Sequence, residues 1–133
     1  MKYRFQQCIG ARLRKLSRIT DSIYRKHLAE FDVTESQISI LFALSNLGLI
    51  EQGAIGNLLA LERSTVSRNV NLLVKKGWVT KSSDYRPEIE LTDQGKKFVE
   101  KIAPIWERAM DEVIEKIGIE GLELIQKLEI GFE

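Results

Sequence analysis

Residues 63–76 read RSTVSRNVNLLVKK, and this stretch decides the fold. Within it, Val66, Val70 and Leu73 recur at the spacing of one face of an α-helix. The opposite face is polar and basic, and Gly77 follows two lysines where such a helix would end. We therefore expect a helix over this stretch that packs through its apolar face and exposes its basic face.

A β-hairpin is expected directly after this helix. Residues 78–80 and 89–91 are rich in strand-forming types, and the segment SSDYRP at residues 82–87 lies between them. Serine, aspartate and proline favour turns, so this segment should form a loop with a polar, basic tip. On the other side of the helix, residues 52–60 predict a short helix that buries Ile55.

The N-terminal part of the chain predicts two further helices. Apolar residues recur every three or four positions over residues 5–23, which is typical of one long amphipathic helix. Thr34 and Gln37 then have the spacing of a capping box, which would start a second helix that ends near Gly48.

The C-terminal part also has a helical pattern. Thr92 would cap a long helix, Pro104 should kink it, and Gly118 should end it. A final helix should follow and bury one aliphatic face. The residues of that face are Ile119, Leu122, Ile125 and Leu128.

The order of these elements indicates a mainly α fold, a winged helix-turn-helix with a three-helix core and a β-hairpin wing. We expect an N-terminal dimerisation helix over residues 1–32, the winged helix-turn-helix over residues 33–95 and C-terminal dimerisation helices over residues 96–133, in one structural domain overall. The flanking helices hold more apolar residues than one small domain can cover, which favours a homodimer. The alternative is that they fold back on their own monomer.

Composition excludes several classes of protein. With 133 residues, of which 44% are hydrophobic and 29% charged, the chain should be globular. No apolar run approaches the length that spans a bilayer and no apolar leader is evident, so we expect a cytoplasmic protein without membrane contact. The single cysteine, Cys8, and the single histidine, His27, predict neither a metal site nor a cofactor site. Without a glycine-rich phosphate loop or paired acids in a cleft, no enzyme is expected.

Charge is unevenly distributed along the chain. The formal net charge is +1, yet residues 63–86 hold six bases against one acid, whereas residues 31–62 hold four acids and no lysine or arginine. Nucleic-acid binding depends on local positive charge, so the basic stretch indicates double-stranded DNA as a partner. The alternatives are an ordinary solvated surface and a winged helix that contacts another protein instead of DNA.

The side-chain types in the basic stretch suit contact with DNA. Arginine can bond a guanine edge in two places, asparagine can pair with adenine, and small hydroxyl side chains let the backbone approach phosphates. The positive end of the helix dipole would add to phosphate contact. The residues expected to contact DNA are Arg63, Ser64, Thr65, Ser67, Arg68, Asn71 and Lys75 on the helix, with Lys81, Ser83 and Arg86 on the hairpin.

Five short segments resemble, in the same order, the motifs of the MarR family of transcription regulators. They are VTESQ at residues 33–37, IGNLLALERSTVSR at 55–68, LVKKGWV at 73–79, DYR at 84–86 and LTDQG at 91–95. The resemblance implies a homodimer that binds a pseudo-palindromic operator and most often represses transcription. Compared with the family pattern the wing is short, which leaves the basic helix a larger share of recognition. Glu62 stands where a short N-cap residue is common in the family.

The resemblance also implies regulation of DNA binding by a small molecule. Regulators of this kind release DNA when a small aromatic anion or a phenol binds between the dimer arms and the reading domain. The candidate contact residues are Tyr24, His27, Phe31 and Trp106. The alternative is that these side chains belong to the core or to an interface.

Cys8 raises a separate hypothesis of thiol-based redox sensing. Peroxide-sensing relatives carry a reactive cysteine in the first helix, where Cys8 is expected to lie. The favoured alternative is a cysteine shielded in a dimer helix, because Glu35 stands where those relatives have an aromatic residue.

Overall fold

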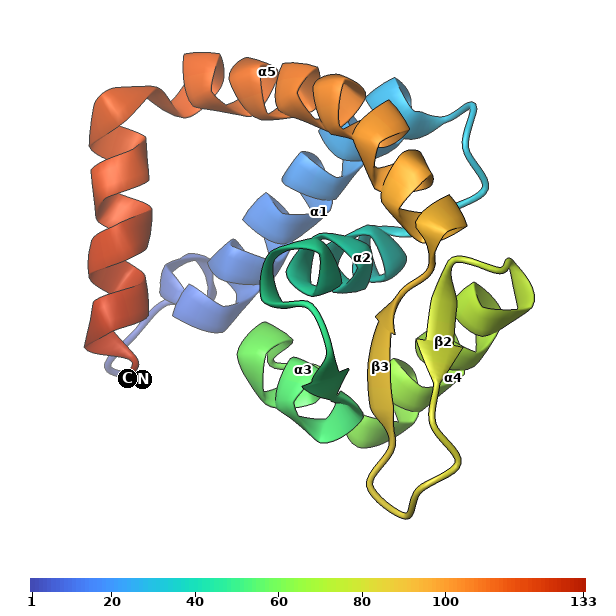
Figure 1. Cartoon of the computed structure of the whole chain (residues 1–133). Helices are drawn as coiled ribbons and strands as arrows, with labels where there is room; N and C mark the ends of the chain where they lie inside the picture. Colours follow the sequence, from blue (N-terminus) through green and yellow to red (C-terminus); the bar gives the residue numbers. More distant parts are fainter. The chain divides into compact units, whose positions relative to one another are not determined.

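The computed structural model describes residues 1–133 and divides them into two compact units. One unit contains residues 31–104, and the other contains residues 1–30 and 105–133. In chain order the elements are η1 (Phe5–Gln7), α1 (Ile9–Leu28), α2 (Glu35–Leu47), β1 (Ile50–Glu51), α3 (Gln52–Leu59), α4 (Arg63–Lys75), β2 (Val79–Lys81), β3 (Glu88–Leu91) and α5 (Asp93–Gly131) (Figure 1). This order confirms the predicted mainly α, winged helix-turn-helix fold.

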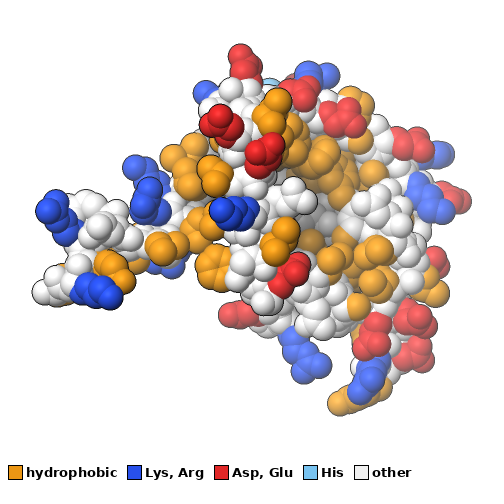
Figure 2. Space-filling model, turned by 90° about the vertical axis from the view of Figure 1, so that its left-hand side faces the viewer, with side chains coloured by type: hydrophobic (Ala, Val, Ile, Leu, Met, Phe, Trp, Pro, Cys, Tyr) orange, Lys and Arg blue, Asp and Glu red, His pale blue; other side chains and the backbone are white.

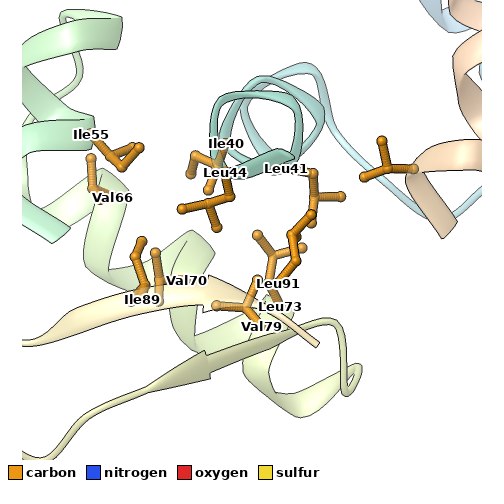
Figure 3. Packing of buried hydrophobic residues seen from close by; sticks show 11 residues of the cluster. Ile40, Leu41, Leu44, Ile55, Val66, Val70, Leu73, Val79, Ile89 and Leu91 are labelled. Atoms are coloured by element: carbon orange, nitrogen blue, oxygen red, sulfur yellow. The ribbon is translucent and has the colours of Figure 1, made fainter. Parts of the chain in front are cut away.

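The core of the unit that spans residues 31–104 lies between α2, α4 and the small sheet. Ile40, Leu41 and Leu44 of α2 point toward side chains of α4 and β3 (Figure 3). The predicted apolar face of α4 is completely inside, with Val66, Val70 and Leu73 all buried. Ile55 of α3 is buried as well, and all of these residues form one cluster. The core therefore fixes which face of α4 is left for other contacts.

The sheet has three antiparallel strands in the order β1-β3-β2. Val79 pairs with Leu91 in the predicted hairpin, and Ile50 of β1 pairs with Ile89 on the other edge of β3. Along β3, Ile89 and Leu91 are buried while Glu88 and Glu90 are exposed, as the alternation of a strand requires. The loop between β2 and β3 extends away from the helices of its unit (Figure 1). β1 was not predicted, because two residues carry no periodic signal.

The predicted N-caps of α2 and α5 are both present. The backbone N–H of Gln37 donates to the hydroxyl of Thr34, and the backbone N–H of Thr34 donates to Oε1 of Gln37, each over 3.2 Å. At the start of α5, the hydroxyl of Thr92 accepts from the N–H of Gly95 over 3.0 Å and donates to the carbonyl oxygen of Gly77 over 2.6 Å. Gly77 itself has a φ of 79°, the left-handed conformation expected after a helix.

The first helix begins later than predicted. Phe5 belongs to the short 3-10 helix η1, and α1 begins at Ile9. The separation arises at Cys8, which is extended, with φ −61° and ψ 110°. The η1 turn is closed locally, because Oε1 of Gln7 accepts from the backbone N–H of Arg4 over 2.8 Å. The expected single helix over residues 5–23 is therefore wrong in its first turn and correct from Ile9 onward.

The last part of the chain agrees with prediction at Gly118 but differs in the helix that follows. Within α5 the backbone torsions leave the helical region only at Gly118, which has φ 70° and ψ 178°. The helix after this break turns away from the direction of the preceding segment (Figure 1). Its aliphatic face is not buried within one chain: Ile119 is 73% exposed, and Leu122, Ile125 and Leu128 are also exposed. None of the helices combines the length and apolar character needed to cross a bilayer.

Candidate nucleic-acid interface

The outer face of α4 is the first candidate for contact with nucleic acid. An open groove on this face is lined by Ser64, Ser67, Arg68, Asn71, Leu72 and Lys75. These side chains share a surface because the core holds the opposite face of the helix. The structure thus brings together most of the helix residues that the sequence predicted to contact DNA.

Arg63 and Thr65, the remaining helix candidates, lie apart from this groove. Arg63 lines a separate hollow together with Tyr85 and Arg86 of the wing. Thr65 is half-buried, and its carbonyl oxygen accepts a hydrogen bond of 3.0 Å from Nδ2 of Asn69. Arg63 therefore lies beside the wing. Its position in the helix alone does not predict this neighbour.

The wing is tied to α4 and closed by short hydrogen bonds. Lys81, at the end of β2, donates from Nζ to Oδ1 of Asn71 over 3.3 Å. The N–H of Ser82 donates to the carbonyl oxygen of Glu88 over 3.0 Å, and the N–H of Glu88 donates to Oγ of Ser82 over 2.9 Å. Two predicted DNA contacts, Lys81 of the wing and Asn71 of α4, are consequently neighbours.

The tip of the wing carries the remaining candidates. Ser83 and Arg86 are exposed there. The carbonyl oxygen of Pro87 accepts from the N–H of Gln52, the first residue of α3, over 2.9 Å. The loop is thus held at its base, by the strand ends and by the start of α3.

A buried polar pair connects α2 with α4. Gln37 and Asn69 are the two buried polar side chains of the chain, and Nε2 of Gln37 donates to Oδ1 of Asn69 over 3.4 Å. Through Nδ2, Asn69 also bonds the carbonyl oxygen of Thr65 in the first turn of α4. Sequence reasoning missed this pair, although Asn69 lies three residues after Val66 and so falls on the buried face by helical spacing.

An aromatic stack holds the end of α4. Trp78 stacks on Phe98 with centroids 3.8 Å apart, and Phe31 meets Phe98 edge-on at 6.0 Å. The ammonium of Lys76 lies 4.9 Å from the Trp78 ring centre and bonds the backbone carbonyl of Asp32. Lys76 is thereby turned away from the α4 groove, in contrast to Lys75.

Residues 31–86, which include this interface, match the model of the MarR family. The match covers the helix-turn-helix and the wing as far as Arg86, the part of the chain in which the candidate contacts lie.

Similar proteins agree with this match. The chain is 27% identical over 105 residues to the uncharacterized HTH-type transcriptional regulator YwaE of Bacillus subtilis, covering 76% of this chain and 61% of that protein. It thus spans about three fifths of the length of this curated relative.

Solved structures of low sequence identity have the same fold. Bordetella bronchiseptica BpsR, whose DNA binding is regulated by 6-hydroxynicotinic acid, has a TM-score of 0.87 at 20% identity, covering 98% of this chain and 96% of its own. PcaV of Streptomyces coelicolor, solved with its natural ligand, has a TM-score of 0.84 at 21% identity over 98% of both chains. NadR, solved with 4-hydroxyphenylacetate, has a TM-score of 0.80 at 22% identity over 93% of both chains.

The four residues expected to contact a small molecule fall into both units. Phe31 lies in the aromatic stack described above, in the unit of residues 31–104. In the other unit, the hydroxyl of Tyr24 donates to the sulfur of Met110, and Trp106 is half-buried. Burial, with a contribution from the charge of Asp21, raises the pKa of Tyr24, so its hydroxyl is a neutral donor at neutral pH.

His27 belongs to a small charged cluster. Its Nε2 atom lies 3.4 Å from Oε1 of Glu112, and Nζ of Lys26 donates to the same oxygen over 2.8 Å. The hydrogen bond from Lys26, followed by that from His27, lowers the pKa of Glu112, while partial burial opposes the shift. Cys8 is exposed at the N-cap of α1, so within one chain it is not shielded.

Proposed function

We propose that this chain is a transcriptional regulator of the MarR family that binds double-stranded DNA sequence-specifically as a homodimer. α4 would enter the major groove with Ser64, Arg68 and Asn71 toward the bases, and the wing would lie against the backbone and minor groove. The observation that carries the proposal is the α4 groove, where these residues lie together beside Lys81 of the wing. The net positive charge of residues 63–86 supports the same surface, because phosphate contact requires local bases.

The remaining predicted contacts have supporting roles in this proposal. Ser67, Lys75 and Ser83 would bond phosphates along the groove, and the half-buried Thr65 would act through its position at the helix start. Arg63 would work with Arg86 at the wing, because both line one hollow.

Dimerisation is supported by apolar surface in the unit of residues 1–30 and 105–133. Aliphatic and aromatic side chains of α1 and of the last part of α5 are open to solvent. They include Ile9, Leu13, Leu16, Ile19, Ile119, Leu122, Leu124, Ile125, Leu128, Ile130 and Phe132. Figure 2 shows one face of the molecule on which apolar side chains lie open between charged ones. Exposed apolar surface of this extent favours association, and a two-fold dimer would present two α4 helices to a pseudo-palindrome.

A small aromatic acid or phenol is the proposed effector, and its binding would release the DNA and relieve repression. The class is supported by 6-hydroxynicotinic acid and 4-hydroxyphenylacetate, the compounds named for BpsR and NadR. Tyr24, His27 and Trp106 would supply ring contacts and hydrogen bonds. An anionic effector near His27 would compete with Glu112 for its ring N–H. In this proposal the chain acts in the cytoplasm, where its operator DNA lies, and carries out no catalysis.

The experiment that tests DNA binding is a fluorescence anisotropy titration at two salt concentrations, with duplexes selected by the protein from a random pool. Specific binding should weaken steeply with salt, because each phosphate contact releases counterions. Enrichment of a palindromic sequence would support the proposed symmetry. Binding without a salt slope, or no enrichment at all, would favour a winged helix that contacts proteins instead. Unchanged DNA binding after peroxide treatment would exclude redox sensing through Cys8.

A further inference from the structure

Tyr85 is the most exposed aromatic residue of the chain, with 99% of its surface open to solvent. It lies at the tip of the wing, between Asp84 and Arg86. An aromatic ring that no neighbour covers contributes nothing to the core, and its apolar surface favours contact with another molecule. The position of Tyr85 therefore requires an explanation other than packing.

The loop that carries Tyr85 is fastened at its base. Both hydrogen bonds between Ser82 and Glu88 close the loop at its base, over 3.0 and 2.9 Å. On the far side, Pro87 is bonded to the start of α3 through the N–H of Gln52. Because both ends of the loop are fastened, the entropic cost of placing Tyr85 against a partner is lower than for a free segment of the same length.

Tyr85 also shares its surroundings with two cations. Tyr85, Arg86 and Arg63 line the same hollow, with Glu51 and the first residues of α3 on its other wall. Two guanidinium groups that line this hollow attract a polyanion. A duplex that contacts Arg86 consequently meets the Tyr85 ring next to it.

We propose that Tyr85 enters the minor groove beside Arg86 and distinguishes A·T from G·C pairs at the flank of the operator. This inference rests on the DNA binding proposed above. The phenol hydroxyl can donate to N3 of adenine or O2 of thymine, whereas the 2-amino group of guanine projects into the same space as a second donor. The ring would cover sugar edges, and its reach would extend a wing that is short by the family pattern.

The test compares three duplexes that differ only at the base pairs under the wing tip: A·T, G·C or inosine·cytosine. Inosine lacks the 2-amino group, so its minor groove resembles that of A·T while its major groove resembles that of G·C. The wild-type protein should bind the A·T and inosine·cytosine duplexes equally, and the G·C duplex about three- to tenfold more weakly, the range of one hydrogen bond. Tyr85→Ala should bind all three with nearly equal affinity, and Tyr85→Phe should fall between.

Matched controls separate this role from general binding. Arg86→Ala should weaken binding to all three duplexes by a similar factor and keep their order. Leu49→Ala, which removes an exposed apolar side chain elsewhere in the unit of residues 31–104, should change nothing. If Tyr85→Ala keeps the wild-type preference, or if inosine·cytosine behaves like G·C, the inference is wrong while the proposed function stands. If the wild-type protein shows no salt-dependent binding to any duplex, the proposed function is wrong and this inference with it.

Discussion

Arg68 carries the main expectation for base recognition, because its exposed side chain lines the α4 groove beside Asn71. A guanidinium that forms two hydrogen bonds to one guanine contributes about 1–3 kcal/mol of discrimination. Arg68→Ala should therefore weaken binding to the selected operator by about 1–3 kcal/mol and weaken binding to random duplex less. Anisotropy titrations on both duplexes at one salt concentration measure the difference. Arg68→Lys should also lose specificity, since it keeps the charge without the planar fork.

Arg86 provides the comparison from the wing. A contact to phosphate carries no sequence information, so Arg86→Ala should weaken binding to operator and random duplex by similar factors. Equal losses on the two duplexes for both Arg68→Ala and Arg86→Ala would contradict the proposed division between base reading and backbone contact.

Ala60 stores strain in the turn of the helix-turn-helix. It follows α3 with φ 53° and ψ 42°, a left-handed conformation that costs a residue with a Cβ about 1–2 kcal/mol. Glycine avoids this cost but loses about 0.4–1 kcal/mol through a more flexible unfolded chain. Ala60→Gly should thus raise the free energy of unfolding by about 0.5–1 kcal/mol in urea denaturation.

Gly77 is the matched control for this substitution. Its φ is 79°, and an added Cβ would lie 2.9 Å from Oε1 of Gln94. Gly77→Ala should therefore lower the free energy of unfolding by about 1–2 kcal/mol, the opposite direction. A loss of stability in Ala60→Gly would show that the turn is not strained.

At the scale of elements, the sequence predicts those features that depend on residues within one or two helical turns of each other. The caps at Thr34 and Thr92, the apolar face of α4 and the turn at Gly77 all depend on near neighbours, and all are present. The α4 groove was predictable for the same reason, since helical spacing assigns its residues to one face. Gly95 of the LTDQG segment is instead explained by a distant neighbour, because a Cβ there would collide with the carbonyl oxygen of Trp78.

What escaped prediction depends on partners far along the chain. β1 forms because Ile50 pairs with Ile89 of β3. The hollow lined by Arg63 and the wing forms because the hairpin lies beside α3. In the same way, the buried side-chain oxygen of Asn69 has a hydrogen-bond partner because Gln37 of α2 lies beside it. Periodicity predicts that a residue lies on the buried face of its helix or strand, but it does not predict which residues of other elements pack against it.

The Gln37–Asn69 pair gives a prediction for how α2 and α4 are coupled. Removing one partner leaves the other buried without its hydrogen bond, which costs about 1–3 kcal/mol, whereas replacing both is far less costly. Asn69→Leu alone should therefore lower the free energy of unfolding by about 1–3 kcal/mol. In the double variant with Gln37→Met, the loss in free energy of unfolding should be smaller than the sum of the two single losses by about 0.5–2 kcal/mol.

The measurement for this pair is a double-mutant cycle in urea. Gln37→Met alone also removes the side-chain acceptor for the N–H of Thr34, so it should cost more than Asn69→Leu. Thr34→Ala, which weakens the same cap without touching Asn69, controls for that part. Strictly additive losses would mean that the bond of 3.4 Å between the two amides does not couple the helices.

For the whole molecule, the apolar faces of α1 and of the last part of α5 favour a dimer as the functional form. Leu16 and Ile125, 58% and 47% exposed in one chain, would become buried in such a dimer. An aspartate at either position would be tolerated by a monomer but would place an unpaired charge inside the interface. Leu16→Asp or Ile125→Asp should therefore yield a folded monomer in analytical ultracentrifugation at concentrations where the wild-type protein is dimeric.

The same variants connect assembly to DNA binding. A dimer binds two half-sites together, so its operator affinity exceeds that of one α4 helix by an avidity factor of about 10²–10⁴. The monomeric variants should lose a factor of this size on the full operator and bind a single half-site as weakly as the wild-type protein does. Leu58→Asp, at a comparably exposed aliphatic position in the unit of residues 31–104, should leave both the dimer and its avidity intact. Full operator affinity in a variant that sediments as a monomer would contradict the two-fold arrangement, because a single α4 helix would then be sufficient for recognition.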